Sequence, residues 1–237
     1  MSQLRKDPTT FMTGQTIITN TNNTISGLDL VRAVGGQVPG QAPPIMASGY
    51  QRTREMTLDE LMLENRVIFL IGEINQASAA RVMMQMLYLE DQKRGQQINL
   101  YINSPGGAVD DTLAMYDTMQ MITSDVATYC IGRAYSGAAV LLCAGSTGNR
   151  YILPHAKVMI HQPYGGITGQ TTDIQIQAEQ IINSKATLNK IISNHTGQPF
   201  DVVASDGERD KYFTAEEAKT YGIVDEVLEH NEEKKKD

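Results

Sequence analysis

The sequence has little of what disulfide-rich proteins and metalloproteins are built from. It contains only two cysteines, Cys130 and Cys143, and both lie inside apolar runs. Buried thiols of a reducing compartment fit this pattern better than a disulfide does. Neither C-x-x-C nor H-E-x-x-H occurs, so the sequence predicts no metal centre and no cofactor.

Long apolar runs and excess positive charge are also lacking. No run approaches the roughly 20 residues that cross a bilayer, and no apolar core of a signal peptide follows the first residues. We therefore expect a cytoplasmic protein without a membrane partner, although an organelle matrix also fits. The net charge of −7 argues against nucleic acid as a partner. With 41% apolar residues, the 237-residue chain can bury one sizeable core.

Ser136 is the most informative residue that the chain does contain. It stands between an apolar strand, 126–131, and an apolar helix, 138–144, with small residues around it. A serine that opens a helix lies near unpaired N–H groups and the positive end of the helix dipole, which favour an oxyanion. The competing interpretation is an ordinary N-cap. A nucleophilic serine needs a general base and an acid elsewhere in the chain, so the presence of such residues distinguishes a nucleophile from a cap.

His161 is the first such partner, since an apolar strand delivers it just before Gln162 and a proline. A general base needs an imidazole anchored in this way, and the alternative is a histidine satisfied at a strand edge. His155 in a turn and His195 near a helix end are weaker candidates. A third partner would be a carboxylate that holds the imidazole tautomer. The acidic stretch offers three that spacing cannot separate: Asp206, Glu208 and Asp210.

The second glycine-rich signal is Ser104-Pro-Gly-Gly, which follows an apolar strand. Its glycines leave backbone N–H groups free to face a ligand, as in half of an oxyanion hole, although the same string is also a common turn. No Gly-Lys-Ser/Thr follows it, so it is not a phosphate loop.

The order of apolar segments alternates helix and strand, which favours an α/β layered fold. In the helix expected over 77–92, we predict that Val82, Met83, Met86, Leu87 and Leu89 face inward. The other expected helices are 58–64, 109–122, 138–144 and 172–194, and the expected strands are 67–70, 98–102, 126–131 and 157–160.

Seven strings that recur in order between about Tyr50 and Leu228 resemble ClpP, the proteolytic subunit of the Clp protease. Each string alone is common, but their joint occurrence is specific. They begin at Arg66 (Arg-Val-Ile-Phe-Leu), Leu100 (Leu-Tyr-Ile-Asn-Ser-Pro-Gly-Gly), Met115 (Met-Tyr-Asp-Thr-Met), Gly132 (the Ser136 segment), Met159 (Met-Ile-His-Gln-Pro), His195 (His-Thr-Gly-Gln) and Glu208 (Glu-Arg-Asp).

The resemblance implies a serine endopeptidase with Ser136 as nucleophile, His161 as general base and Asp210 as the orienting acid. It also implies that the backbone N–H groups of Gly107 and Gly137 form the oxyanion hole. The implied fold is the crotonase-like spiral of ββα units with a protruding handle helix. The implied assembly is a tetradecamer of two stacked heptameric rings, homomeric or mixed, that degrades unfolded proteins fed by a Clp-type AAA+ ATPase.

Several positions depart from the family pattern. Gly137 replaces the usual methionine after the serine, Tyr135 replaces a small residue and is expected to narrow the substrate path, and Asn99 replaces a tyrosine of the apolar pocket that docks the ATPase. The stretch from Ala108 to Thr112 replaces a small, polar, glycine-containing segment and adds two carboxylates near the substrate groove.

The chain is expected to divide into an N-terminal arm over 1–43, a protease domain over 44–230 and a charged tail over 231–237. The arm is a propeptide, a retained arm on the ring or an organelle transit peptide, and residues 44–56 resemble a pore loop of the family. The charged tail is expected to be a solvated chain end.

Three other functions compete with an active Clp peptidase. A catalytically weak structural subunit of a mixed ring would explain the changes near Ser136 and Gly107, whereas the intact serine, histidine and aspartate argue against it. A crotonase-type acyl-CoA enzyme shares the glycine turn but leaves the serine and histidine segments unexplained. A membrane-associated serine–lysine peptidase with a similar turn lacks its anchor here. The sequence leaves the ATPase, arm processing and cleavage preference open.

Overall fold

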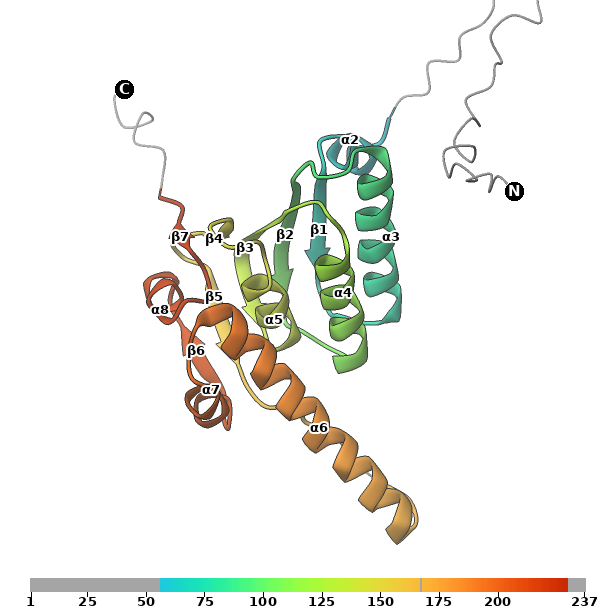
Figure 1. The fold of residues 1–237 in the computed structure, drawn as a ribbon, viewed down its shortest axis with the longest axis vertical. Coiled ribbons are helices and arrows are strands. Elements are labelled where there is room, and N and C mark those ends of the chain that lie inside the picture. The colour runs from blue at the N-terminus through green and yellow to red at the C-terminus, as the bar shows by residue number, and fades with distance from the viewer. Residues whose placement is uncertain (1–55, 167, 230–237) are drawn as a thin grey trace, which may run out of the picture. The chain divides into compact units, whose positions relative to one another are not determined.

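The fold is an α/β arrangement around one mixed sheet, which confirms the α/β layers expected from the alternation of helices and strands. A computed structural model describes residues 56–166 and 168–229 (Figure 1). The expected arm over 1–43, all but the last residue of the expected pore loop over 44–56, and the tail over 231–237 lie outside these residues. The described helices are α2 (Leu58–Glu64), α3 (Gln76–Gln92), α4 (Val109–Met121), α5 (Gly137–Cys143), α6 (Thr171–Thr196), α7 (Phe200–Asp206) and α8 (Ala215–Tyr221).

The sheet is parallel except at one edge. Its strands are β1 (Val67–Ile71), β2 (Ile98–Ser104), β3 (Val126–Tyr135), β4 (Arg150–Ile152), β5 (Lys157–Ile160), β6 (Lys211–Phe213) and β7 (Glu226–Val227). Their main order is β1-β2-β3-β4-β7. The C-terminal half of β3 pairs instead with β5, and β5 pairs antiparallel with β6. Strand β3 is long enough to pair with β4 along its first half and with β5 along its second half. It therefore extends from the centre of the sheet to Ser136, which directly follows it.

One face of the sheet is covered by α3, α4 and α5 (Figure 1). Alternate residues of β2 are buried under them, as expected for a strand with period two. In α3 the buried residues Ala79, Val82, Met86 and Leu89 form the inward stripe. Met83 is partly buried, whereas Leu87 is 45% exposed, so the prediction that Leu87 faces inward was wrong. A step of about 100° per residue turns Leu87 away from the stripe that contains Met86.

The opposite face carries a row of adjacent aromatic rings. Phe69, Tyr101, Tyr129 and Tyr151 are directly paired neighbours on β1, β2, β3 and β4. The centroids of Tyr101 and Tyr129 are 4.5 Å apart, and those of Tyr129 and Tyr151 are 4.9 Å apart. Tyr129 also donates a hydrogen bond to Asn99 Oδ1. We call these four rings the aromatic row.

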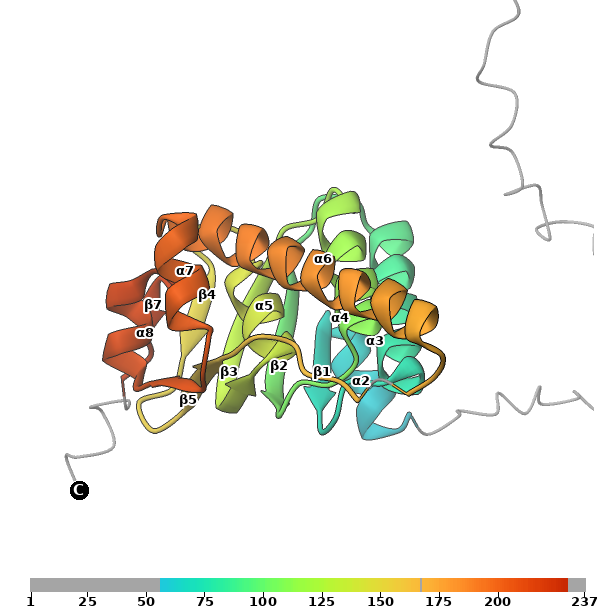
Figure 2. The same ribbon diagram turned by 90° about the horizontal axis from the view of Figure 1, so that it is seen from below.

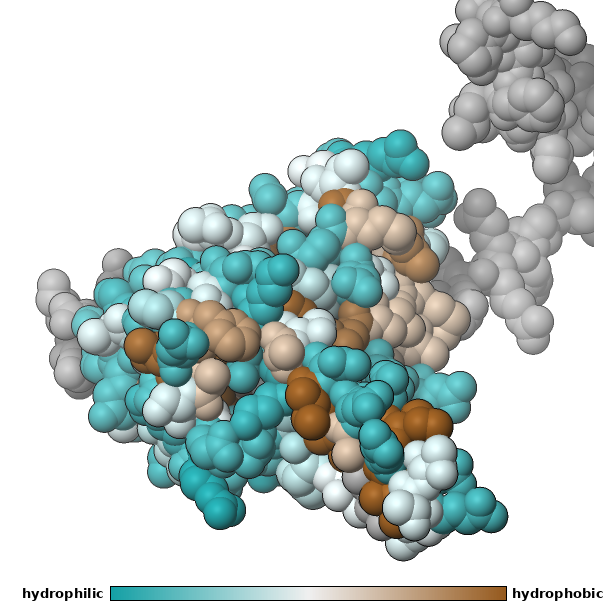
Figure 3. All heavy atoms as spheres, turned by 60° about the horizontal axis from the view of Figure 1, so that its bottom comes forward, coloured by the Kyte–Doolittle hydropathy of each residue, from teal (hydrophilic) through white to brown (hydrophobic). Residues whose placement is uncertain are grey.

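Helix α6 is buried at one end and exposed at the other. Its C-terminal half buries Leu188, Ile191 and Ile192 and packs against α5 and α7 (Figure 2). Its N-terminal half leaves Ile174 and Ile182 40% and 65% exposed. Figure 3 shows apolar residues among hydrophilic ones at this end of the molecule. The helix ends at Gly197, whose φ of 75° gives a left-handed C-cap.

Arg150 ties the C-terminal segments to the core. Its side chain is 8% exposed and donates to both carboxylate oxygens of Asp225, at 2.6 and 2.9 Å. It also donates to the carbonyl oxygens of Cys143, His195 and Gly222. Burial alone would raise the pKa of Asp225, but the hydrogen bonds and charge of Arg150, with backbone N–H donors, lower that pKa overall.

The long elements agree with the sequence predictions to within one or two residues, apart from β3. Strand β2 continues two residues past 102, to Ser104, and β3 continues past residue 131 to Tyr135, directly before Ser136. Five short elements were not predicted: β4, α7, β6, α8 and β7. Both cysteines are buried and unpaired, as expected, and burial raises the pKa of each thiol to about 12.

Candidate active site

Ser136 lies on a strained turn between β3 and α5. Its φ of 55° and ψ of −125° place a non-glycine residue where side chains rarely occur, at a cost of about 1–3 kcal/mol. The Ser136 N–H donates to Met159 O of β5 at 2.8 Å, so the sheet holds the serine in this conformation. A sharp turn of this kind between strand and helix presents a hydroxyl at the end of a sheet, as nucleophile elbows do.

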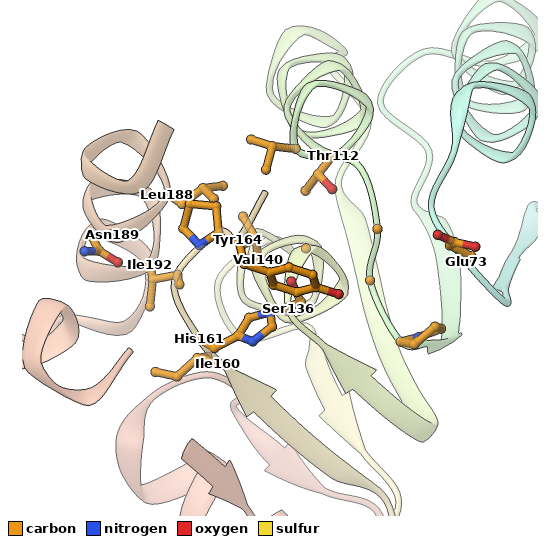
Figure 4. Close-up of a pocket in the computed structure, with 16 residues that line it drawn as sticks. Glu73, Thr112, Ser136, Val140, Ile160, His161, Tyr164, Leu188, Asn189 and Ile192 are labelled. Atoms are coloured by element: carbon orange, nitrogen blue, oxygen red, sulfur yellow. The ribbon is translucent and has the colours of Figure 1, made fainter. Parts of the chain in front are cut away.

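The Ser136 side chain does not cap α5. It stands at the N-cap position, yet it makes no capping hydrogen bond. The N-cap interpretation of this serine is therefore wrong. Its hydroxyl instead lines a cavity of about 340 Å³ that His161, Gly107 and Gly137 also line (Figure 4).

His161 and Asp210 come together through the antiparallel pair of β5 and β6. The last ladder pair is Ile160 with Lys211. His161 follows Ile160 and Asp210 precedes Lys211, so these two residues stand opposite one another just past the ladder. His161 Nδ1 lies 3.0 Å from Asp210 Oδ1. The His161 side chain is 15% exposed and that of Asp210 is 55% exposed. Figure 4 shows the His161 ring beside Ser136.

The Ser-Pro-Gly-Gly turn passes close beside the serine. A β-carbon added to Gly106 would lie 2.5 Å from Tyr135 O, and one added to Gly107 would lie 2.0 Å from Ile74 O. Ile74 N–H donates to Gly106 O, and Ala108 N–H donates to Ile74 O. Because successive amides of an extended segment alternate in direction, the Gly107 N–H points away from Ile74. Only glycine allows this approach of the two backbones.

Most other lining residues of the cavity are apolar. They come from α4, α5, α6, the end of β5 and the segment after His161, and include Val109, Val140, Ile160, Pro163, Leu188 and Ile192. The Tyr164 ring packs edge-on against the His161 ring at 5.6 Å and is 87% exposed. A cavity with apolar walls and a few polar groups at one end suits an apolar side chain beside a reacting carbonyl group.

A polar cluster beside His161 and Asp210 was not found from the sequence. Lys185 Nζ donates to Gln162 Oε1 at 2.8 Å and to Glu208 Oε2 at 2.7 Å. Gln162 Nε2 donates to Glu208 O at 3.1 Å. The hydrogen bond and charge of Lys185 lower the pKa of Glu208. Nothing in the local sequence distinguishes Lys185 from other solvated lysines, so only the fold reveals this cluster.

The remaining candidates lie elsewhere. His195 contacts the Tyr116 hydroxyl at 3.2 Å, and burial lowers its pKa. Asp206 accepts from Tyr221 and pairs with Lys211. His155, in its turn, is not among the residues that line the cavity. Of the three carboxylates left open by spacing, Asp210 is the one that contacts His161.

Among the departures from the family pattern, Gly137 and Thr112 line the cavity, whereas Asp110, Asp111 and Tyr135 do not. A β-carbon at Gly137 would lie 2.3 Å from Thr112 Oγ1, so these two departures occupy one space. Thr112 lines the cavity, whereas Asp110 and Asp111 stand beside it in the first turn of α4. The Tyr135 ring packs edge-on against Tyr212 and is not among the residues that line the cavity, so a narrowing of the substrate path by Tyr135 stays a prediction.

Membrane spans and metal sites can be assessed for residues 56–166 and 168–229. No helix there is both long and apolar enough to span a bilayer. No group of three or more histidine, cysteine, aspartate or glutamate side chains there is arranged to hold a metal ion.

A strained serine at a strand–helix turn, an imidazole–carboxylate pair and a glycine turn around one cavity are typical of serine hydrolases. Comparison with known proteins gives a narrower class. Residues 49–231 match the profile of the Clp protease family. The chain is also 52% identical over 179 residues to ATP-dependent Clp protease proteolytic subunit 1 of Rhodopirellula baltica, covering 76% of this chain and 79% of that protein. The chain therefore belongs to the Clp protease family, as the sequence resemblance predicted, and a purely structural subunit is not favoured.

Proposed function

We propose that the chain is a Clp serine endopeptidase in which Ser136, His161 and Asp210 are the catalytic residues. The observation that carries the assignment is the 3.0 Å contact between His161 and Asp210 at the cavity that the strained Ser136 also lines. His161 takes the Ser136 proton as the serine oxygen attacks a peptide carbonyl carbon. Asp210 holds the imidazole tautomer and stabilises the imidazolium without taking the proton itself.

The developing oxyanion is held by backbone groups. We assign this role to the N–H groups of Gly107 and Gly137, each typically worth about 3 kcal/mol in the transition state. Both glycines line the cavity, and the orientation inferred for the Gly107 N–H supports the assignment. The imidazolium then protonates the leaving amine, and water hydrolyses the acyl-enzyme with His161 again acting as base.

The substrates that we propose are unfolded proteins, delivered by a Clp-type AAA+ ATPase. The relative in Rhodopirellula baltica is named an ATP-dependent proteolytic subunit. The sequence contains no phosphate-loop motif, so we assign ATP hydrolysis to the partner. Asn99, which accepts a hydrogen bond from Tyr129 of the aromatic row, stands at the position that resembles part of the family's docking pocket.

The assembly that we propose is a tetradecamer of two stacked heptameric rings with the crotonase-like spiral fold. Helix α6 is the proposed handle between the rings, because Ile174, Ile176 and Ile182 leave it with apolar surface to bury. Residues 44–230 would form the protease domain, with 1–43 as an arm and 231–237 as a tail. Two buried, unpaired cysteines support the cytoplasm as its compartment.

The first experiment is hydrolysis of a short fluorogenic peptide by the purified chain, with Ser136→Ala as the control. The oligomeric mass is measured in the same buffer. We expect turnover from a tetradecamer and its loss in the variant. An assembled but inert wild-type protein would refute the peptidase assignment.

A further inference from the structure

The contact between His161 and Asp210 lies just beyond the end of the sheet. Ile160 and Lys211 form the last pair of the β5–β6 ladder, and β6 is only three residues long. The Asp210 side chain is 55% exposed, so burial does little to fix it. Other contacts have to hold the two chain segments in register past this point.

Gln162 and Glu208 supply these contacts. Gln162 directly follows His161, and its Nε2 donates to Glu208 O at 3.1 Å. Glu208 precedes Asp210 by two residues. Lys185 Nζ then donates to both side chains, to Gln162 Oε1 at 2.8 Å and to Glu208 Oε2 at 2.7 Å. A single ammonium group therefore joins the segment that carries the histidine to the segment that carries the aspartate.

Lys185 reaches this cluster from a third element, α6. Leu188, Asn189 and Ile192 lie three, four and seven residues further along the helix, on the same side as Lys185. These three residues line the cavity, as Figure 4 shows. The helix that forms one wall of the cavity is thus tied directly to the residues that flank His161 and Asp210.

This ion pair is placed to affect geometry more than stability. The side chains of Lys185 and Glu208 are 29% and 59% exposed, and pairs of this exposure contribute about 0–1 kcal/mol to folding. Proton transfer is more demanding, because a displacement of about 1 Å in a catalytic group can cost on the order of 100-fold in rate. Loss of the pair should therefore reduce turnover without unfolding the protein.

We propose that Lys185 is a positioning residue, which holds Gln162 and Glu208 together and so keeps His161 and Asp210 in register beside Ser136. The inference rests on the proposed serine mechanism. It adds α6 to the elements that determine catalytic geometry.

The test compares Lys185→Met and Lys185→Arg with the wild-type protein in peptide hydrolysis. We expect kcat to fall about tenfold in the methionine variant, with KM changed less than twofold. Arginine keeps the charge and can donate to both partners, so it should restore kcat to within about threefold of wild type. Glu208→Gln, which keeps a hydrogen-bond acceptor without the charge, should lie between the two.

Arg81→Met is the matched control. It removes a 2.8 Å ion pair between Arg81 of α3 and Asp59 of α2. The side chain of Arg81 is 58% exposed and that of Asp59 is 72% exposed. Its kcat should equal that of the wild-type protein. A Lys185→Met enzyme with wild-type kcat would overturn the inference, and so would an arginine variant as slow as the methionine variant.

Two further measurements separate this inference from its alternatives. A methionine variant whose particle mass differs from wild type would overturn the positioning role in favour of a role in assembly. Ser136→Ala in the same assay tests the mechanism itself. Turnover that survives in Ser136→Ala refutes the proposed function, whereas an inert Ser136→Ala beside a fully active Lys185→Met refutes only the inference.

Discussion

Gly137 and Thr112 share one space beside the nucleophile. A β-carbon on Gly137 would lie 2.3 Å from Thr112 Oγ1 and 3.1 Å from Thr112 Cγ2. Thr112 is fully buried, and its hydroxyl donates to Ala108 O, so it has no free direction in which to move. The size of the residue after the serine and the size of the residue on α4 are therefore mutually constrained.

This relationship predicts a compensating pair of substitutions. Gly137→Met should overpack the site at a cost of about 1–3 kcal/mol and reduce kcat/KM at least tenfold, because the backbone N–H beside Ser136 is displaced. Adding Thr112→Gly should restore most of both losses. Thermal unfolding and peptide hydrolysis of the two single variants and the double variant measure the coupling. Purely additive effects would contradict the shared space.

The acid of the site is predicted from its contact with His161. Asp210→Asn should lower kcat by about 100- to 10,000-fold, because an amide that donates to Nδ1 imposes the wrong imidazole tautomer. Peptide hydrolysis under substrate saturation measures this effect. Asp206→Asn is the control, since Asp206 contacts Tyr221 and Lys211 instead. Comparable losses of activity in the two folded variants would argue against Asp210 as the acid.

The glycine turn is predicted to tolerate no side chain at position 107. Gly107→Ala should abolish measurable turnover, because its β-carbon would lie 2.0 Å from Ile74 O and would force the turn away from Ser136. Gly165→Ala provides the comparison, since a β-carbon there would meet only Ile181 Cδ1, at 3.7 Å. We expect the Gly165 variant to keep at least half of wild-type kcat/KM. An active Gly107→Ala enzyme would disprove the assigned geometry.

The pair of Arg150 and Asp225 is predicted to stabilise the fold. Asp225→Ala leaves a buried guanidinium without its carboxylate, so the free energy of unfolding should fall by about 3 kcal/mol at pH 7. Denaturant titration measures the change. Asp201→Ala, which removes an exposed carboxylate of α7, should change it by less than about 0.5 kcal/mol.

The same pair predicts a pH dependence. The pKa of Asp225 is lowered in the folded protein, so its stabilisation is fully present above the unfolded-state pKa of about 4. It is lost as the pH falls through the lower pKa of the folded state. The difference in Tm between wild type and Asp225→Ala should therefore be constant from pH 6 to 8 and shrink below about pH 4. A difference that grows on acidification would contradict this sign.

The sequence predicted the parts of the fold that have long, periodic elements. Helices α3, α4 and α6 and strand β5 follow from apolar spacing, whereas β4, β6 and β7 have three residues or fewer and show no period. The strand expected over 126–131 is too short, because β3 continues through Gly132 to Tyr135. Short elements depend on their tertiary neighbours, which a single sequence does not display.

Some residues of the site could be predicted from the sequence and others could not. Ser136 and His161 are recognisable because each follows an apolar strand. The choice among Asp206, Glu208 and Asp210 depends on the register of β6 against β5, and three carboxylates within five residues carry no such information. The family resemblance implies Asp210, and the contact of Asp210 with His161 agrees with it. Lys185 lies 23 residues from each of its partners, so its role could not be read locally.

The division of the site between two regions of the sheet has a consequence for how activity is lost. Ser136 follows β3, which pairs with β2, β4 and β5, whereas Asp210 precedes β6, which pairs only with β5 in the part of the chain described. Detaching β6 breaks far fewer contacts than unfolding the core, so it is a sub-global opening of low free energy. The enzyme should consequently become inactive by local opening well below its melting temperature, with its serine still in place, and should recover on cooling.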